Sequence, residues 1–282
     1  HFNLANVLKE QDKLQEASRA YQAAIKNRPD YPQAFNNLGS VYHDAGEVQN
    51  AVECYRKAVS FDSNFADAYQ NMAVALHDQM NFASAKEAFQ KSLDLKCSPE
   101  ALKNLANLLK DQGYINDAKQ CFEKSLELRP DFSEALYDLS LLHLMEHNFD
   151  QGFDLYENRW ETRQWGSERN FQSIPRWQGQ PDKTVLVWAE QGIGDEIMFS
   201  SMIPELEKVS SSITVQCDTR LIELFQNSFG NNIRFQGTDE PILKEDYDCQ
   251  IPMGSLCSFF RSNKSDFLNA STKFLCCDKR KS

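Results

Sequence analysis

FNNLGSVY, at residues 35–42, is the stretch of sequence that decides the fold of the first half of this chain. Its small residue, Gly39, has an equivalent 34 residues earlier and further equivalents at steps of 34, 33 and 34 residues. A second small position and an aromatic position move in step with it. Five units in register over about 160 residues indicate a repeat architecture. These positions hold Ala5, Gly39, Ala73, Ala106 and Ser140, then Ala17, Ala51, Ala85, Ala118 and Gly152, then Tyr21, Tyr55, Phe89, Phe122 and Tyr156.

The repeated unit resembles the tetratricopeptide pattern W-x-x-L-G-x-x-Y…A-x-x-x-F, with Phe35 in place of Trp and Tyr55 in place of Phe. The resemblance implies an α-solenoid of paired antiparallel helices, in which small residues let the two backbones approach. Pro29 and Pro130 are expected in turns between units, because the residue before a proline leaves the helical region. We expect this solenoid to span residues 1–165, with a truncated first unit and the natural N-terminus upstream of His1.

An amide side chain stands two positions before the small residue in four of the five units, and an aspartate does so in the fifth, on the helix expected to line the concave groove. Because an amide both donates and accepts hydrogen bonds, it can pair with the backbone of an extended peptide of any sequence. The series resembles the asparagine ladder of the protein O-linked N-acetylglucosamine transferases, which implies a protein or extended peptide as partner. The alternative is that these side chains only face solvent on the helix surface. Asn is a poor helix former, however, and a residue chosen only for solubility would favour the helix more. The positions are Asn3, Asn37, Asn71, Asn104 and Asp138, followed seven residues after each asparagine by Glu10, Asp44, Asp78 and Asp111, which would make the groove acidic.

Composition narrows the possible partners and surroundings. The 282 residues suffice for two domains, and 41% hydrophobic residues support a real core. A net charge of −11 argues against nucleic acid as a partner. We find no run of 18 apolar residues and expect no membrane span. The eight cysteines form no C-x-x-C pair, which fits a reducing, cytoplasmic location.

A metal site is not expected. His143 and His147 stand four residues apart, a spacing that can place two ligands on one helix face. However, His143 takes the place of Tyr42 in its unit, and His147 falls at the predicted helix end. Ordinary packing therefore explains both histidines.

After the fifth unit the pattern changes from helical to extended. Residues 166–182 are expected to form a linker, and residues 183–282 a partial Rossmann-like α/β domain. Residues 184–189 are apolar and β-branched, as in a buried parallel strand, and a glycine turn containing Gly192 and Gly194 precedes an amphipathic helix. Strand, glycine turn and helix open a doubly wound domain. Further strands are expected at 213–217, 233–235 and 248–251, with helices at 220–226 and 255–260.

The glycine turn does not predict a dinucleotide site. The fingerprint for such a site needs a third glycine where Ile197 stands. Asp195 and Glu196 would also repel a pyrophosphate from the start of the helix. No resident cofactor is expected.

The sequence around this turn instead resembles that of bacterial proteins in which tetratricopeptide repeats are joined to a heptosyltransferase-like glycosyltransferase domain. The likeness rests on YENRW at 156–160, WAEQGIGDE at 188–196, CDTRL at 217–221 and IPMGSL at 251–256. It implies the N-terminal, acceptor-facing half of a GT-B fold, a nucleotide-sugar donor and Asp195 as catalytic base. The donor-binding half would lie beyond Ser282, so we expect the chain to be a fragment that is inactive alone.

One further argument supports a catalytic carboxylate on this turn, and two alternatives remain open: helix capping by Asp195 and a non-catalytic protein. Glu190 and Glu196 crowd the same turn, and repulsion among the three carboxylates would raise the pKa of one of them, as catalysis by a base requires. Asp195 also stands where a helix cap is common, and capping needs no catalysis. The whole chain could equally be a non-catalytic adaptor whose α/β segment caps the solenoid.

Overall fold

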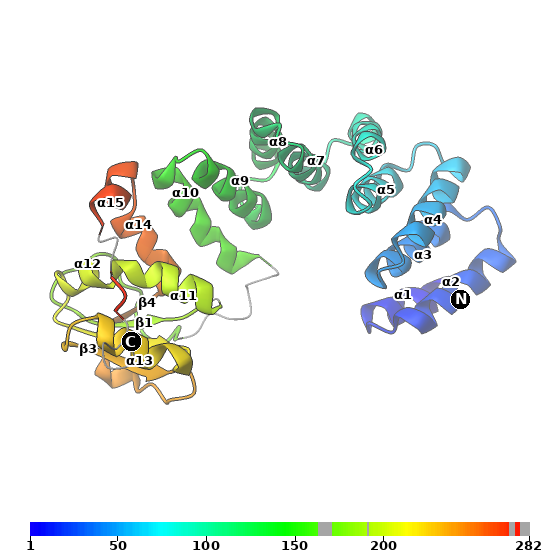
Figure 1. The fold of residues 1–282 in the computed structure, drawn as a ribbon. Coiled ribbons are helices and arrows are strands. Elements are labelled where there is room, and N and C mark those ends of the chain that lie inside the picture. The colour runs from blue at the N-terminus through cyan, green and yellow to red at the C-terminus, as the bar shows by residue number, and fades with distance from the viewer. Residues whose placement is uncertain (163–170, 191, 271–273, 277–282) are drawn as a thin grey trace. The chain divides into compact units, whose positions relative to one another are not determined.

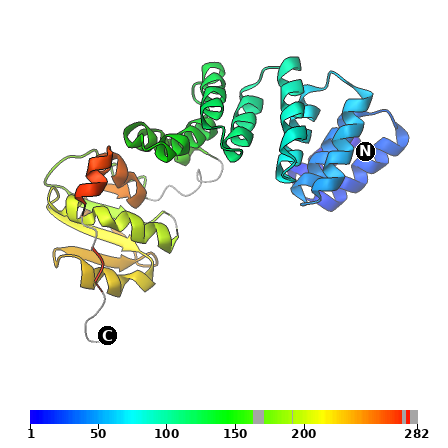
Figure 2. The same cartoon turned by 45° about the horizontal axis from the view of Figure 1, so that its top comes forward.

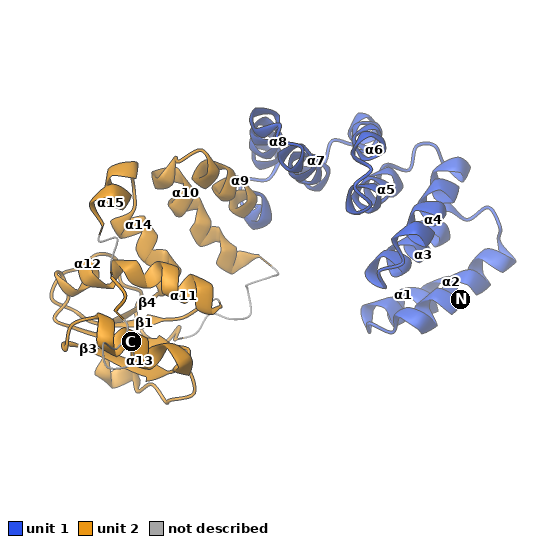
Figure 3. Ribbon diagram, viewed as in Figure 1, with its two compact units in different colours: residues 1–135 blue, residues 136–282 orange. Residues whose placement is uncertain are grey.

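The computed structural model describes residues 1–162, 171–190, 192–270 and 274–276. The chain forms two compact units, residues 1–135 and 136–282 (Figure 3). The domain boundary expected at residue 165 therefore falls inside the second unit.

The first unit consists of helices in successive pairs, each pair joined by a short turn (Figures 1 and 2). Pro29 and Pro130 lie in the turns between pairs, as the sequence predicts. Pro32 and Pro99 instead open helices, at positions where a missing N–H costs nothing. The helices are α1 (Phe2–Glu10), α2 (Leu14–Asn27), α3 (Pro32–Asp44), α4 (Val48–Phe61), α5 (Ala66–Asp78), α6 (Phe82–Leu95), α7 (Pro99–Asp111) and α8 (Ile115–Leu128), and α9 (Ser133–Met145) begins in this unit.

Small residues lie where the paired helices meet. Ala5, Ala17, Ala73 and Ala85 are fully buried. A Cβ atom on Gly39 would lie 2.7 Å from Cε1 of Tyr55, so the glycine accommodates the aromatic ring of the partner helix. In this repeat the small residue and the aromatic residue of the pattern therefore contact each other directly.

The turn inside each repeat places one residue in the left-handed region of the backbone. These residues recur with the period of the repeat, and only two of them are glycines. The φ angles are 58° at Asp12, 78° at Gly46, 58° at Met80, 80° at Gly113 and 61° at His147.

The second unit contains the end of the repeats and a small parallel sheet. Its strands follow the order β3-β2-β1-β4, in which a doubly wound sheet begins. The strands are β1 (Thr184–Trp188), β2 (Ser212–Cys217), β3 (Ile233–Gly237) and β4 (Cys249–Pro252). The helices are α10 (Phe149–Tyr156), α11 (Ile193–Phe199), α12 (Ile203–Glu207), α13 (Ile222–Ser228), α14 (Cys257–Phe260) and α15 (Lys264–Asn269), with 3₁₀ turns η1 (Glu157–Glu161), η2 (Ser200–Met202), η3 (Thr219–Leu221), η4 (Lys244–Asp246) and η5 (Met253–Leu256).

The two faces of the sheet differ in chemistry. Val187, Val215 and Phe235 share one face and join a single apolar core with residues of α11 to α14. The other face is mixed, because the buried Leu186 and Trp188 of β1 lie in register with polar residues of β2. Its buried polar residues are Thr214, Gln216, Gln236 and Gln250. The parallel sheet expected from the sequence is present. A complete Rossmann half of GT-B type stays a prediction, since in the described residues the β3–β4 connection carries only the short η4.

Candidate functional site

The asparagine ladder forms part of a continuous chain of amide hydrogen bonds across three repeats. Asn71 Nδ2 donates to Asn36 Oδ1 at 3.0 Å, and Asn36 Nδ2 donates to Asn37 Oδ1 at 3.2 Å. Asn37 Nδ2 in turn donates to Asn6 Oδ1 at 3.1 Å, an oxygen that also accepts from Tyr21 Oη at 2.5 Å. The amides therefore hold one another in fixed orientations. Of the other ladder positions, Asn3 is exposed, and Asn104 and Asp138 are partly buried.

The acidic positions of the groove are paired between repeats. Lys9 Nζ lies 3.3 Å from Asp44 Oδ2 in the next repeat. The equivalent pairs further along are His43 with Asp78 at 2.6 Å and His77 with Asp111 at 2.9 Å. Each of these aspartates therefore has a partner on a neighbouring repeat, and the Lys9–Asp44 pair is the one of the three that places a fixed positive charge beside the carboxylate.

Asp195 lies on the first turn of α11, directly after β1. Gly192 is the N-cap of that helix, and no side chain caps it among the described residues. The Asp195 carboxylate makes no hydrogen bond or ion pair with the described part of the chain. The capping role considered from the sequence is thus not the one Asp195 has. Gly192 and Gly194 are both exposed on the same turn.

Glu190 belongs to a buried ion pair. Its Oε2 accepts from Arg159 Nη2 at 2.7 Å, and both side chains are almost completely buried, at 2% and 0% exposed. Arg159 Nη2 also donates to Ser255 Oγ at 2.8 Å, and Arg159 Nη1 lies 3.0 Å from Glu157 Oε1. Glu190 Oε1 accepts from the Gly254 N–H at 3.0 Å, and a Cβ at Gly254 would overlap that oxygen. The Arg159 guanidinium therefore connects the segment after β1 with the segment after β4.

Glu196 has a structural partner as well. It is 5% exposed, and its Oε2 accepts from the Asp218 N–H at 2.9 Å. Burial raises the pKa of Glu196, and the Asp218 N–H opposes that effect. Burial likewise raises the pKa of Glu190, against the opposing charge of Arg159. Burial, and not repulsion among the three carboxylates of the turn, is the leading cause of both increases.

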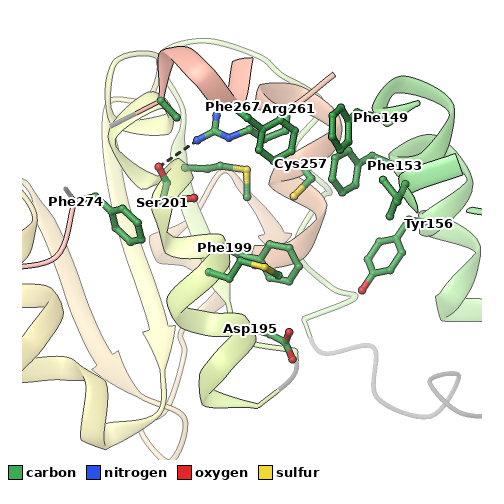
Figure 4. A pocket seen from close by; sticks show the side chains of 14 residues that line it. Phe149, Phe153, Tyr156, Asp195, Phe199, Ser201, Cys257, Arg261, Phe267 and Phe274 are labelled. Carbon is green, nitrogen blue, oxygen red and sulfur yellow. Dashed lines mark hydrogen bonds between the residues drawn. The ribbon is translucent and has the colours of Figure 1, made fainter. Parts of the chain in front are cut away.

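A pocket of about 570 Å³ opens beside Asp195 (Figure 4). Its walls come from α9, α10, α11, η2, α14 and α15, and the Asp195 carboxylate lies at the same end as the Tyr156 ring (Figure 4). The lining is mainly apolar and aromatic, with Phe149, Phe153, Phe199, Phe267 and Phe274 among its residues.

The second charged residue of this pocket is Arg261, and its charge is already neutralised. Arg261 Nη1 lies 3.0 Å from Glu205 Oε1 and donates to the Phe260 carbonyl at 2.7 Å. Arg261 Nη2 donates to the Ser201 carbonyl at 3.4 Å. Asp195 is thus the only charged lining residue without an ionic partner in the described part of the chain.

His143 and His147, the two histidines considered as metal ligands, have different surroundings. His143 is 6% exposed, and Asn148 Nδ2 lies 3.0 Å from its Nδ1. His147 lies beyond the end of α9, in the left-handed turn. Within the described ranges, no group of three or more His, Cys, Asp or Glu side chains could hold a metal ion. No described helix is both long and apolar enough to cross a membrane.

Several of these residues are not apparent from the sequence pattern. Asn6 and Asn36 lie near ladder positions in the sequence, but only the packed repeats show that these two residues form hydrogen bonds with Asn37 and Asn71. Arg159 lies 31 residues from Glu190 and 96 from Ser255, so no local spacing reveals the network. Lys9, His43 and His77 carry a visible signal, since each immediately precedes an acidic residue in register.

Comparisons with known proteins identify the repeats. A family profile described as "Tetratricopeptide repeat" matches residues 2–71 and 103–168. A second, "YpiA-like, C-terminal tetratricopeptide repeats", matches residues 66–131. The chain therefore contains tetratricopeptide repeats, as the sequence predicts.

Solved structures share the repeat fold. A crystal structure of MamA is 21% identical with a TM-score of 0.51, covering 60% of this chain and 99% of that one. A solved structure of PilF from Pseudomonas aeruginosa is 21% identical with a TM-score of 0.53, covering 57% of this chain and 73% of that one. At such identities the likeness shows the fold alone.

Among curated proteins, the chain is similar to protein FlbA of Caulobacter vibrioides. The two are 34% identical over 86 residues, 28% of this chain. The match spans only 14% of the length of FlbA.

Proposed function

We propose that this chain joins a protein-binding tetratricopeptide scaffold to the acceptor-side half of a sugar-nucleotide-dependent glycosyltransferase. The observation that carries the proposal is the Asp195 carboxylate, which has no partner among the described residues and lies beside a pocket. A carboxylate with no structural bond is available to bind a ligand. The other two carboxylates of the turn, Glu190 and Glu196, hold the structure around it.

The position of Asp195 supports this chemistry. Parallel sheets bind ligands outside the carboxyl ends of their strands, at the point where strand order reverses. Here β1 lies between β2 and β4, so the turn after β1 stands at that point. The Arg159–Glu190 pair fixes this turn against the start of η5, at the end of β4.

The proposed reaction assigns one proton to Asp195. The acceptor hydroxyl oxygen attacks the anomeric carbon of the donor sugar, while the bond from that carbon to the diphosphate oxygen breaks. The hydroxyl proton passes to the Asp195 carboxylate, and the nucleoside diphosphate leaves. Such general base catalysis typically contributes a factor of about 10²–10⁴.

The groove supports the protein-binding part of the proposal. An asparagine that donates one N–H to its neighbour keeps a second for a peptide carbonyl. Bonds between repeats fix Asn37 and Asn71 before a peptide arrives, which lowers the entropy lost on binding. The same amide chain favours the second candidate, a non-catalytic adaptor, since it needs no reaction at Asp195.

Replacing Asp195 with Asn tests the enzyme against the adaptor. The assay follows donor consumption by the complete gene product, at matched thermal stability. We expect Asp195→Asn to lower turnover by about two to four orders of magnitude, because an amide cannot accept the proton. Asp154→Asn, an exposed carboxylate on α10, is the matched control and should retain activity. Turnover near wild type in Asp195→Asn would favour the adaptor.

A further inference from the structure

The pocket beside Asp195 is suited to a small amphiphile. Its volume of about 570 Å³ lies within the range of small-molecule sites. Its walls are built largely from phenylalanine rings, and Met198 and Met202 line it with side chains that adapt their shape. A ligand that fills it must therefore present mostly apolar surface.

The charges in the pocket select the polar end of that ligand. Arg261 is held by Glu205 and by two backbone carbonyls, so it offers no unpaired cation to an anion. Asp195 leaves a carboxylate that accepts hydrogen bonds and repels negative charge. A hydroxyl group satisfies this arrangement, because it donates to the carboxylate without bringing a charge into the apolar site.

We propose that the pocket binds a neutral alcohol with an apolar body of roughly ten carbon atoms, its hydroxyl donated to Asp195. The proposal rests on the proposed function only in naming this alcohol as the acceptor class. Binding itself requires no sugar donor and no second domain.

Two probes of equal length isolate the effect of charge. Decan-1-ol and decanoate carry the same number of carbons, and calorimetry on the whole chain measures the affinity of each. We expect decan-1-ol to bind at least about tenfold more tightly, since a carboxylate near Asp195 meets like charge in a site of low dielectric. Within the series hexan-1-ol, octan-1-ol and decan-1-ol, each added CH₂ should raise the affinity about fourfold.

Three variants assign the probe to this pocket. Asp195→Asn should reduce the preference for the alcohol over decanoate to about threefold or less, because the repelling charge is gone. Asp154→Asn makes the same change in net charge at an exposed position outside the pocket and should keep the full preference. Ala270→Trp places a large ring at a partly exposed lining position of the pocket and should weaken decan-1-ol about tenfold or more. Circular dichroism confirms that each variant is folded.

The outcomes separate this proposal from the proposed function. No binding of decan-1-ol, equal binding of both probes, or an unchanged preference in Asp195→Asn would each overturn the amphiphile site, even if sugar transfer is observed. Binding as described, with no transfer by the complete gene product, would retain the site and reject the glycosyltransferase. A pocket filled by another protein segment would bind neither probe.

Discussion

Arg159 is the residue on which the second unit depends most directly. It has no exposed surface, and it bonds to Glu157, Glu190 and Ser255 while its guanidinium lies 4.3 Å from the Tyr156 ring centre. A buried charge of this kind is favourable only while its partners remain in place. The network joins the end of the last repeat to two strand ends of the sheet.

Replacing Arg159 with Met should destabilise the second unit by about 3–5 kcal/mol, because Glu190 is left as a buried charge without a cation. The measurement is urea unfolding followed by tryptophan fluorescence. All four tryptophans, Trp160, Trp165, Trp177 and Trp188, lie after residue 135, so the signal reports this unit alone. Combining Arg159→Met with Glu190→Gln should recover part of the loss, since the uncharged amide still accepts from Gly254. A double variant no more stable than Arg159→Met would contradict the network.

Buried thiols should make the second unit sensitive to alkaline pH. Burial raises the pKa of Cys217 and of Cys257 to about 12, from an ordinary 9.0. Between pH 9 and 12 these thiols ionise in the unfolded chain but not in the folded one. The contribution of these thiols to the free energy of unfolding is therefore constant below pH 9 and falls above it, by about 1.4 kcal/mol per pH unit for each thiol.

Urea titrations at pH 7, 9.5 and 10.5 measure this slope. Cys217→Ala should reduce the fall in the free energy of unfolding per pH unit by the contribution of one thiol, even if the substitution also changes the stability at pH 7. Cys97→Ala removes an exposed thiol of the first unit and serves as the control. Equal slopes in wild type and Cys217→Ala would exclude the buried thiol as the cause.

At the scale of elements, sequence patterns locate most helices and strands well. The strands expected at 213–217 and 248–251 are observed at Ser212–Cys217 and Cys249–Pro252. Period and β-branching are local signals, which explains this agreement. The mixed second face of the sheet, the pocket and the Arg159 network depend on segments far apart in the chain. No local pattern reports such contacts.

The repeated left-handed turn is an element whose sequence does not match its geometry in every repeat. Gly46 and Gly113 suit it, whereas Met80 takes the same conformation at 74% exposure, with φ at 58°. For a residue with a Cβ that conformation costs about 1–2 kcal/mol.

Replacing Met80 with Gly should therefore stabilise the first unit, by about 0.5–1 kcal/mol after allowing for the greater freedom of an unfolded glycine. The reciprocal variant Gly46→Ala should destabilise it by a similar amount, since the added Cβ meets no atom within 4 Å and conformation alone is changed. Thermal unfolding followed by circular dichroism compares the two. Shifts of the same sign in both variants would contradict this account of the turn.

At the scale of the molecule, the division at residue 135 assigns the end of the repeats to the second unit. A fragment 133–282 keeps α10 and Arg159 with the sheet and should fold with native tryptophan fluorescence. A fragment 171–282 loses Arg159 and the α10 wall of the pocket, and it should not fold, because Glu190 then lacks its cation. A fragment 1–132 should give a helical spectrum and a cooperative melt, since its contacts join neighbouring repeats. A folded fragment 171–282 would instead support the boundary that the sequence predicts near residue 165.

The fifth repeat also bears on how proteins of this design can diverge. Its helix α10 supplies Phe149, Phe153 and Tyr156 to the pocket. Each earlier repeat contacts only its neighbours, so gene duplication or loss of a block of about 34 residues upstream of Ser133 would lengthen or shorten the groove without altering a pocket residue. Selection on the partner and selection on the pocket can then proceed separately. Variation in repeat number among descendants of one gene is therefore expected before α9, while the α9–α10 pair is inherited together with the sheet.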